Sequence, residues 1–390
     1  MPVLFMVALL DLIGFGIVIP ILPFLSPSLG ADKMDIALII VTYALCAGLF
    51  APFWGRLSDR LGRKPVIMIC LAGAAVSYTM LAFASTLWMI FVARGFAGAM
   101  AGNFGVASAM MADITTPENR ARGMGLIGSA FGLGLVLGPL LGGLLTVDGD
   151  SFTLPCIVAG CMSVLAILAA ALFLPESLSQ ERRAAHAATQ KKGQQGSILA
   201  MLRATGNRLL VFQYTLHNAF VSSATYIFPL WVGDLLNWNA REVGIVFGVQ
   251  GAIMVLLQGV VLGPAVQAFG EVRLLRIGLS ACLVGLMLAV NADTAPMMVA
   301  AMLVALSGTT MCMPLLNTII SHSTPTEVRG RMMGTTGAAS SWGRVAGPLI
   351  AGTNLALFGY SGAWLGCIFI VFFYFLWAWS LQERSVEQMV

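Results

Sequence analysis

Long apolar segments follow one another along the chain and are separated by short polar stretches. Each segment is about 20 residues or longer, which is the length that an α-helix needs to cross the hydrocarbon core of a bilayer. None alternates in the way that a membrane strand would, so helices are expected. The pattern predicts an all-α membrane protein with twelve transmembrane helices. The expected spans are residues 3–25, 36–55, 66–84, 87–111, 123–146, 153–174, 209–233, 242–263, 272–291, 295–321, 331–357 and 361–381.

The composition supports this class. Hydrophobic residues make up 58% of the chain and charged residues only 10%, whereas about a quarter of a soluble protein is charged. The first apolar segment has no basic stretch before it and no small-residue cleavage site after it, so a signal peptide is not expected. The seven cysteines lie in apolar segments without a CxxC or Cys/His cluster, which indicates reduced thiols. We expect no enzymatic activity, metal, cofactor or nucleic-acid partner.

The positive charges predict the orientation. All but four of the 21 Lys and Arg residues fall on the side of the membrane that holds the N-terminus. Lys33 and Arg241 lie on the other side, and Arg94 and Arg344 lie within spans. Because basic residues collect in cytoplasmic loops, we expect both termini in the cytoplasm. The expected location is the bacterial inner membrane.

A polar, basic stretch at 177–208 divides the chain into six spans and six. We therefore expect a six-helix bundle at 1–176, a cytoplasmic linker at 177–208 and a second bundle at 209–390. The two halves are repeats, because "RARGMGLIGSAFGLGLVLGPLLGG" (120–143) matches "RGRMMGTTGAASSWGRVAGPLIAG" (329–352) at 12 of 24 positions without gaps. Secondary transporters built from two parallel repeats bind substrate near the membrane midplane between the halves.

The loop after the second span reads "GRLSDRLGRKP" (55–65). Anchoring of a basic loop on the cytoplasmic side explains its charge but not its order, which resembles the signature loop of the major facilitator superfamily. The residues that carry the resemblance are Gly55, Asp59, Arg60, Gly62 and Arg63. The resemblance implies that the aspartate interacts with the start of span 11, that Arg63 meets Asp113 at the end of span 4, and that together they latch the outward-facing state. The counterpart "GPAVQAFGE" (263–271) has lost the charges, so an asymmetric latch is expected.

Span 5 contains "GLGLVLGPLLGG", in which Gly134, Gly138 and Gly142 recur every four residues on one helix face and Pro139 adds a bend. Small residues in this spacing let a neighbouring helix approach closely, and tight packing alone is one interpretation. The stretch also resembles the Gly-Pro motif of proton-coupled exporters of the superfamily.

Span 4 carries Arg94 in "ARGFAGAMAGNFG" (93–105), roughly two turns from its outer end. A buried arginine in a membrane costs at least a few kcal/mol (about 2.5–3.5 on insertion scales). Drug–proton antiporters of the superfamily have an arginine here within an Arg-x-x-Gln-Gly pattern, of which this chain has Ala97 in place of the glutamine. The resemblance implies a role in proton coupling. The alternative is that Arg94 only pins helices through backbone carbonyl groups.

Span 1 contains one acid, Asp11, in "ALLDLIGFGIVIPILPFL" (8–25). It is the only carboxylate deep in the apolar part of any span. A medium of low dielectric favours the protonated carboxyl group, and a charge or a water-filled cavity nearby opposes this, so such a group can exchange protons. The stretch resembles the first helix of tetracycline-type exporters, including the acid and both prolines. A structural aspartate that caps or bridges helices is the alternative.

The remaining polar groups within the spans are weaker candidates. His217 could relay protons or only hydrogen-bond to a neighbour. Arg344 would favour an anionic or zwitterionic substrate if it faces the cavity, and would be structural otherwise. The expected lining of the substrate cavity is Asn103, Asn218, Phe220, Tyr226, Gln250, Asn317 and Arg344.

The resemblance has gaps. Tetracycline-type exporters have a histidine in span 8 and acids in spans 3 and 9, and this chain has none of these, which argues against tetracycline as the natural substrate. We predict a monomeric antiporter in the lipid bilayer that exports a small amphipathic organic molecule in exchange for protons by alternating access. The alternatives are an uptake symporter or facilitator for a small metabolite, with an anion as one option, and a sensor or scaffold without transport.

Overall fold

The computed structural model describes residues 1–116, 119–146, 152–178, 201–203 and 205–381. The described residues form helices and contain no strand. They group into two compact units, Met1–Gln195 with Trp238–Gly251, and Gly196–Asn237 with Ala252–Val390. Most of the expected linker at 177–208 lies outside the described residues, and so do the chain's last nine.

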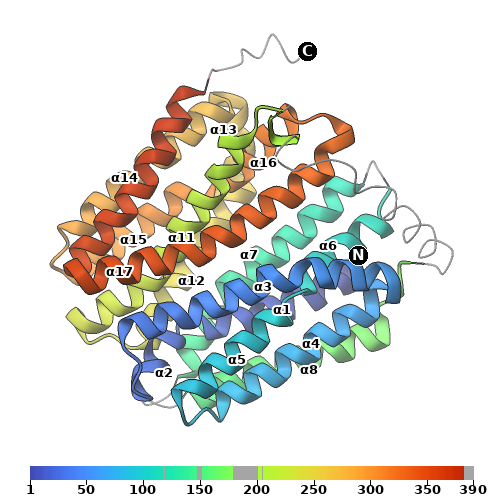
Figure 1. Ribbon diagram of the computed structural model, residues 1–390, viewed down its shortest axis with the longest axis horizontal. Helices are drawn as coiled ribbons and strands as arrows, with labels where there is room; N and C mark the ends of the chain where they lie inside the picture. Colours follow the sequence, from blue (N-terminus) through green and yellow to red (C-terminus); the bar gives the residue numbers. More distant parts are fainter. Residues whose placement is uncertain (117–118, 147–151, 179–200, 204, 382–390) are drawn as a thin grey trace. The chain divides into compact units, whose positions relative to one another are not determined.

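The first unit begins with a bent pair of helices, α1 (Pro2–Val18) and α2 (Leu22–Ser28), which meet at 45°. Pro20 and Pro23 explain the break, because proline lacks the amide hydrogen and clashes with the preceding turn. The other helices of this unit are α3 (Lys33–Leu61), α4 (Arg63–Ala82), α5 (Leu87–Ala99), α6 (Asn103–Ile114), α7 (Arg120–Leu145), α8 (Thr153–Phe173) and the first part of α12 (Ala240–Leu256) (Figure 1).

The second unit repeats this order. Its remaining elements are α11 (Arg208–Leu236), the π-helical turn η1 (Leu257–Val261), α13 (Leu262–Phe269), α14 (Glu271–Val290), α15 (Ala295–Thr310), α16 (Cys312–Ser323) and α17 (Thr326–Ser380). The long α17 is two helices joined at Gly359, whose φ of 69° is open to glycine but strained for other residues.

The number of spans matches the prediction. Ten helices of the described chain are long and apolar enough to cross a membrane, and one of these is α17. The two arms of α17 count separately, and the bent α1–α2 pair adds one more span. The twelve-helix prediction is confirmed.

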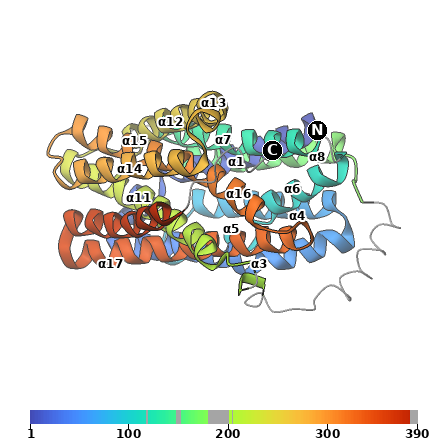
Figure 2. The same cartoon turned by 90° about the horizontal axis from the view of Figure 1, so that it is seen from above.

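Helix pairing inside the two units is also equivalent. In the first unit α1 packs against α7 and α8, and in the second α11 packs along α17 (Figure 2). The glycine face of α7 makes the first contact close. A methyl group added to Gly16 of α1 would come within 2.9 Å of the Gly138 Cα, and methyl groups at Gly134 and Gly142 would overlap Leu12 and Ile17. In the second unit Gly343 and Gly347 of α17 meet α11 at Thr215 and Ala219 in the same way.

Span 4 and span 10 are each broken near the middle. The first break lies between α5 and α6, where the Trp54 indole donates a 2.6 Å hydrogen bond to the Ala99 carbonyl. The second lies between α15 and α16, where the Gln258 amide donates a 2.9 Å bond to the Thr310 carbonyl. Each donor satisfies a carbonyl group that the interrupted helix leaves unpaired. The first break makes Asn103 the opening residue of α6, next to α1.

Candidate functional site

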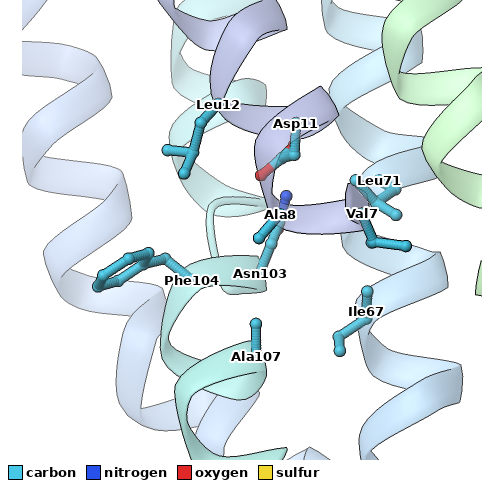
Figure 3. A pocket seen from close by; sticks show the side chains of 9 residues that line it. All are labelled: Val7, Ala8, Asp11, Leu12, Ile67, Leu71, Asn103, Phe104 and Ala107. Atoms are coloured by element: carbon cyan, nitrogen blue, oxygen red, sulfur yellow. The ribbon is translucent and has the colours of Figure 1, made fainter. Parts of the chain in front are cut away.

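Asp11 lies in the middle of α1 and is half-buried. It borders a pocket within the first unit, which α1, α4 and α6 form together (Figure 3). The side chains that share the pocket with Asp11 are Val7, Ala8, Leu12, Ile67, Leu71, Asn103, Phe104 and Ala107. Since Asn103 is the only other polar member, the carboxylate is in apolar surroundings.

Asn103 is the polar partner of Asp11. Its amide nitrogen points toward a carboxylate oxygen of Asp11 and is placed to donate a hydrogen bond (Figure 3). The Asn103 Oδ1 atom is buried and has no hydrogen-bond partner among the described residues. Asn103 is one of the expected cavity residues, and the break in span 4 brings it next to the Asp11 carboxylate.

The pocket beside Asp11 is small. The centre of a water molecule can move within a volume of about 10 Å³, which corresponds to room for roughly one water. It is too small for an organic substrate, because drug-sized ligands occupy pockets of about 300 Å³ or more. It is large enough for a single water beside the carboxylate.

Arg94 is buried in the same unit, with 5% of its surface exposed. Its guanidinium carbon lies 4.3 Å from the ring centre of Tyr43, a cation–π contact. Its Nε atom has no hydrogen-bond partner in the described part of the chain. The ionisable groups that act on it there are Tyr43, Tyr78 and Cys156, and none of these is a carboxylate. Direct pairing of Arg94 with Asp11 is therefore not what the structure shows.

Tyr78 on α4 lies near both of these charged residues. Its side chain is buried and lies within electrostatic reach of both Asp11 and Arg94. Its ring edge packs beside Gly14, one turn after Asp11, where a methyl group would be 3.5 Å from Cε2. Next to it, Ser77 donates a 2.9 Å hydrogen bond to the carbonyl of Ala93, which precedes Arg94. Tyr78 is not identifiable from the sequence, because a tyrosine in an apolar span has no distinctive pattern.

The signature loop forms a charged cluster at one end of the first unit. Arg63 contacts Asp59 at 2.8 Å through Nη1 and Asp113 at 3.0 Å through Nε. Its Nη1 also donates a 2.6 Å hydrogen bond to Ser58. Gly62 has a φ of 110°, which lets the chain turn sharply between α3 and α4. Gly55 has open space around it, and Arg60 is exposed in the last turn of α3.

Glu176 is a further member of this cluster that was not predicted from the sequence. Its carboxylate accepts hydrogen bonds from the backbone nitrogens of Arg63 at 2.9 Å and Lys64 at 3.2 Å. These are the first two residues of α4, so Glu176 satisfies amide groups that the helix start leaves free. Ser177 follows and donates a 3.4 Å bond to Asp113. Glu176 lies 113 residues from Arg63, so no local pattern links the two.

His217 is a buried residue of α11 in the second unit. Its ring meets Tyr374 edge to face with 6.2 Å between centres, and its Nδ1 has no partner among the described residues. Tyr214, one turn before, donates a 2.8 Å hydrogen bond from its hydroxyl group to Asn317 Oδ1. Asn218 donates to the Tyr214 carbonyl at 2.9 Å. Tyr214 and Asn317 thus bond to each other, and Asn218 bonds to the backbone of its own helix.

The other expected cavity residues occupy different environments. Phe220 and Tyr226 are fully buried and Gln250 is nearly so, which makes them core residues in this structure. Arg344 is exposed and donates a 3.1 Å hydrogen bond to Ser341, three residues before it on α17. All seven cysteines are free.

These features define a class of protein. They are typical of a secondary transporter: twelve apolar helices in two repeats, one half-buried acid in the first helix, and a charged cluster at the loop after span 2. A family model of the Major Facilitator Superfamily matches residues 4–261 and, separately, 210–388. The chain belongs to this superfamily.

Several curated relatives are tetracycline resistance proteins. The class G protein of Vibrio anguillarum is 32% identical over 370 residues, which cover 93% of this chain and 91% of that protein. The class C protein of Escherichia coli is also 32% identical and covers 93% of this chain and 90% of its own length. Among solved structures, the human organic anion transporter MFSD10 (TETRAN) has a TM-score of 0.72 at 24% identity, covering 97% of this chain and 98% of that one. The predicted relationship to tetracycline-type exporters of the drug–proton antiporter group is confirmed.

Proposed function

We propose that the protein is a proton-coupled antiporter that exports a small amphipathic organic molecule, with Asp11 as its proton-binding group. The observation that carries the assignment of Asp11 is its environment. A half-buried carboxylate lies in apolar surroundings, with one amide partner and room for one water. A group that must both gain and lose a proton needs water access without full solvation.

Asn103 can serve both protonation states of Asp11. The ionised carboxylate accepts a hydrogen bond from the Asn103 amide NH₂ group. The protonated carboxyl group can donate to an amide oxygen, and the Asn103 Oδ1 is free for this once the amide turns. The Asp11 carboxyl group then has an amide partner in both protonation states, which keeps the energy difference between the two states small.

Arg94 supplies the opposite charge at longer range. When Asp11 loses its proton, its negative charge and the positive charge of the buried Arg94 lie in the same unit, with Tyr78 near both. The cation favours release of the proton but does not form a contact ion pair that would hold the carboxylate permanently ionised. Arg94 thereby tunes proton binding through Tyr78 rather than by direct contact.

The transport cycle follows from the two repeats. Two six-helix bundles, residues 1–176 and 209–390, rock about a central site. A charged cluster latches one end state of this motion. Its members are Gly55, Asp59, Arg60, Gly62, Arg63 and Asp113, with Glu176 as an added member. The face of Gly134, Gly138 and Gly142 holds α7 against α1 next to Asp11. Both termini are cytoplasmic in the inner membrane, and one chain is the working unit.

The experiment is substrate flux in proteoliposomes under an imposed pH gradient. Tetracycline is the first probe because the relatives are tetracycline resistance proteins, and a panel of amphipathic cations and anions follows. Wild type is expected to accumulate at least one probe against its gradient, and Asp11→Asn is expected to reduce this at least tenfold. Asp11→Asn should still exchange labelled for unlabelled probe without a gradient, which shows that it is folded. Full gradient-driven accumulation by Asp11→Asn would contradict the assignment.

A further inference from the structure

The second unit contains a pair of residues at the positions of Arg63 and Asp113. Glu271 is the first residue of α14, just as Arg63 is the first residue of α4. The glycine before each has a positive φ and an extended ψ, with values of 110° and 159° at Gly62 and 75° and 163° at Gly270. The backbone therefore presents both side chains in the same way.

The partner positions agree as well. Asp113 is the last residue but one of α6, and His322 is the last but one of α16. Each of these helices has 12 residues and is followed by a threonine in extended conformation, Thr115 or Thr324. The two pairs are thus equivalent by repeat, by helix and by position within the helix.

The contact in the second unit joins opposite charges in the reverse order. The His322 Nε2 atom lies 3.8 Å from the Glu271 Oε1 atom, whereas Arg63 Nε lies 3.0 Å from Asp113 Oδ2. The acid now begins the helix after the loop, and the base ends the broken span. The loop "GPAVQAFGE" (263–271) was expected to lack charges, but its last residue, Glu271, is the acid of this pair, and the base lies on α16.

The exchange of residue types changes the chemistry. Arginine keeps its charge at all physiological pH values. Histidine is the side chain whose charge ordinarily changes between pH 5 and 8, so the pair with Glu271 is ionic only while His322 is protonated. The His322 side chain is 56% exposed, against 7% for Arg63, so protons from the adjacent solution can reach it.

We infer that Glu271 and His322 form a second, proton-dependent latch, the charge-reversed counterpart of Arg63–Asp113. With the proposed orientation this latch faces the cytoplasm. It is engaged while His322 is protonated and is released when His322 loses its proton. The charge of the first latch does not change with pH, and the second latch adjusts the transporter to the pH on that side. The inference rests on the proposed function for its effect on transport, but not for the existence of the pair.

Other charged groups near this end bear on the test. The helices packed against α16 are α11, α14 and α15, and α15 has no charged residue. The charged side chains at the matching ends of the described helices are Arg208 on α11, Glu271, Arg273 and Arg276 on α14, and Arg331 on α17. Arg276 donates to the carbonyl groups of Ala378, Trp379 and Leu381. Glu271 is the acid of this set, so it is the residue to change together with His322.

The first experiment needs no transport. Melting temperatures of the purified wild type, Glu271→Gln, His322→Asn and the double variant are compared at pH 6 and pH 8.5. The two substitutions are expected to be non-additive at pH 6 and additive at pH 8.5. The variant E271R/H322D copies the residue types of the first unit. It should be as stable as wild type at pH 6, and its ion pair should still stabilise it at pH 8.5. Additive effects at both values would overturn the pair.

The second experiment measures flux in proteoliposomes as the pH on the cytoplasmic face is varied and the gradient is held constant. An engaged latch slows the conformational change. The flux of His322→Asn is therefore expected to be about two- to fivefold faster than that of wild type at pH 6, the range that an exposed ion pair can supply. At pH 8.5 the two fluxes should be equal. Asp113→Asn is the control, because it removes the permanent pair and its effect should not depend on pH. If His322→Asn keeps the pH dependence of the wild type, the regulatory role is wrong. The role of Asp11 in the proposed function is tested separately, by the gradient-driven flux of Asp11→Asn.

Discussion

The Arg94 guanidinium carbon lies 4.3 Å from the ring centre of Tyr43, while its Nε atom is buried without a hydrogen-bond partner among the described residues. An aromatic face compensates only part of the cost of burying this charge. A residue that is unfavourable for stability and has no carboxylate in contact is typical of a functional site, where stability is given up for activity.

Replacement of Arg94 should therefore separate stability from transport. Arg94→Met keeps most of the side-chain volume and removes the buried charge, whose burial costs roughly a few kcal/mol. We expect the melting temperature in detergent to rise by several degrees and gradient-driven flux to fall at least tenfold. A lower melting temperature would show instead that Arg94 holds helices together.

Removal of the Asn103 amide should impair coupling without unfolding the protein. Asn103→Leu leaves Asp11 without its only polar side-chain neighbour in the pocket, so one protonation state becomes much more favourable than the other. Flux driven by a pH gradient should fall about tenfold or more, and exchange without a gradient should remain. The control is Ile67→Val in the same pocket, for which we expect flux within about twofold of wild type. Equal behaviour of the two variants would contradict the role of Asn103.

The hydroxyl group of Tyr78 is the third target. Tyr78→Phe keeps the ring against Gly14 and removes only the polar group near Asp11 and Arg94. Coupled flux is expected to fall about fivefold, with an unchanged melting temperature. The neighbouring Thr79→Val is the matched control, because its hydroxyl group bonds only to the Ala75 carbonyl of its own helix on an exposed face. Tyr78 would be a packing residue alone if both variants transport like wild type.

Two glycines of α7 should respond in opposite directions. A methyl group at Gly138 would lie within 2.5 Å of the Gly16 Cα, whereas one at Gly128 has nothing within 4 Å. Gly138→Ala is expected to destabilise the protein by about 1–3 kcal/mol because the backbones must move apart. Gly128→Ala should stabilise it by up to about 1 kcal/mol, since alanine restricts the unfolded chain and favours the helix. The measurement is thermal unfolding of the two variants in one detergent. Equal stability of the two variants would show a helix contact that is loose enough to accept either substitution.

The architecture could be predicted from the sequence because it depends on local properties. The length and hydropathy of each span are set by the bilayer, and the repeat places equivalent residues in equivalent helices. The contact between Arg63 and Asp113 was expected from the resemblance of the loop to its family. Asp11 could be identified from the sequence because a single carboxylate in an apolar span is costly wherever the helix lies.

Only the tertiary structure decided which groups meet. Asn103 faces Asp11 because span 4 is interrupted just before it, and hydropathy does not detect such a break. Tyr78 and Glu176 come from helices whose rotation and packing determine their partners, at separations of 67 and 113 residues from Asp11 and Arg63. Phe220 and Tyr226, expected in the cavity, are core residues in this structure. The sequence by itself determined which residues enter the membrane and how often, since that depends on transfer from water to lipid. The choice of neighbours depends on how whole helices pack, and no single segment contains that information.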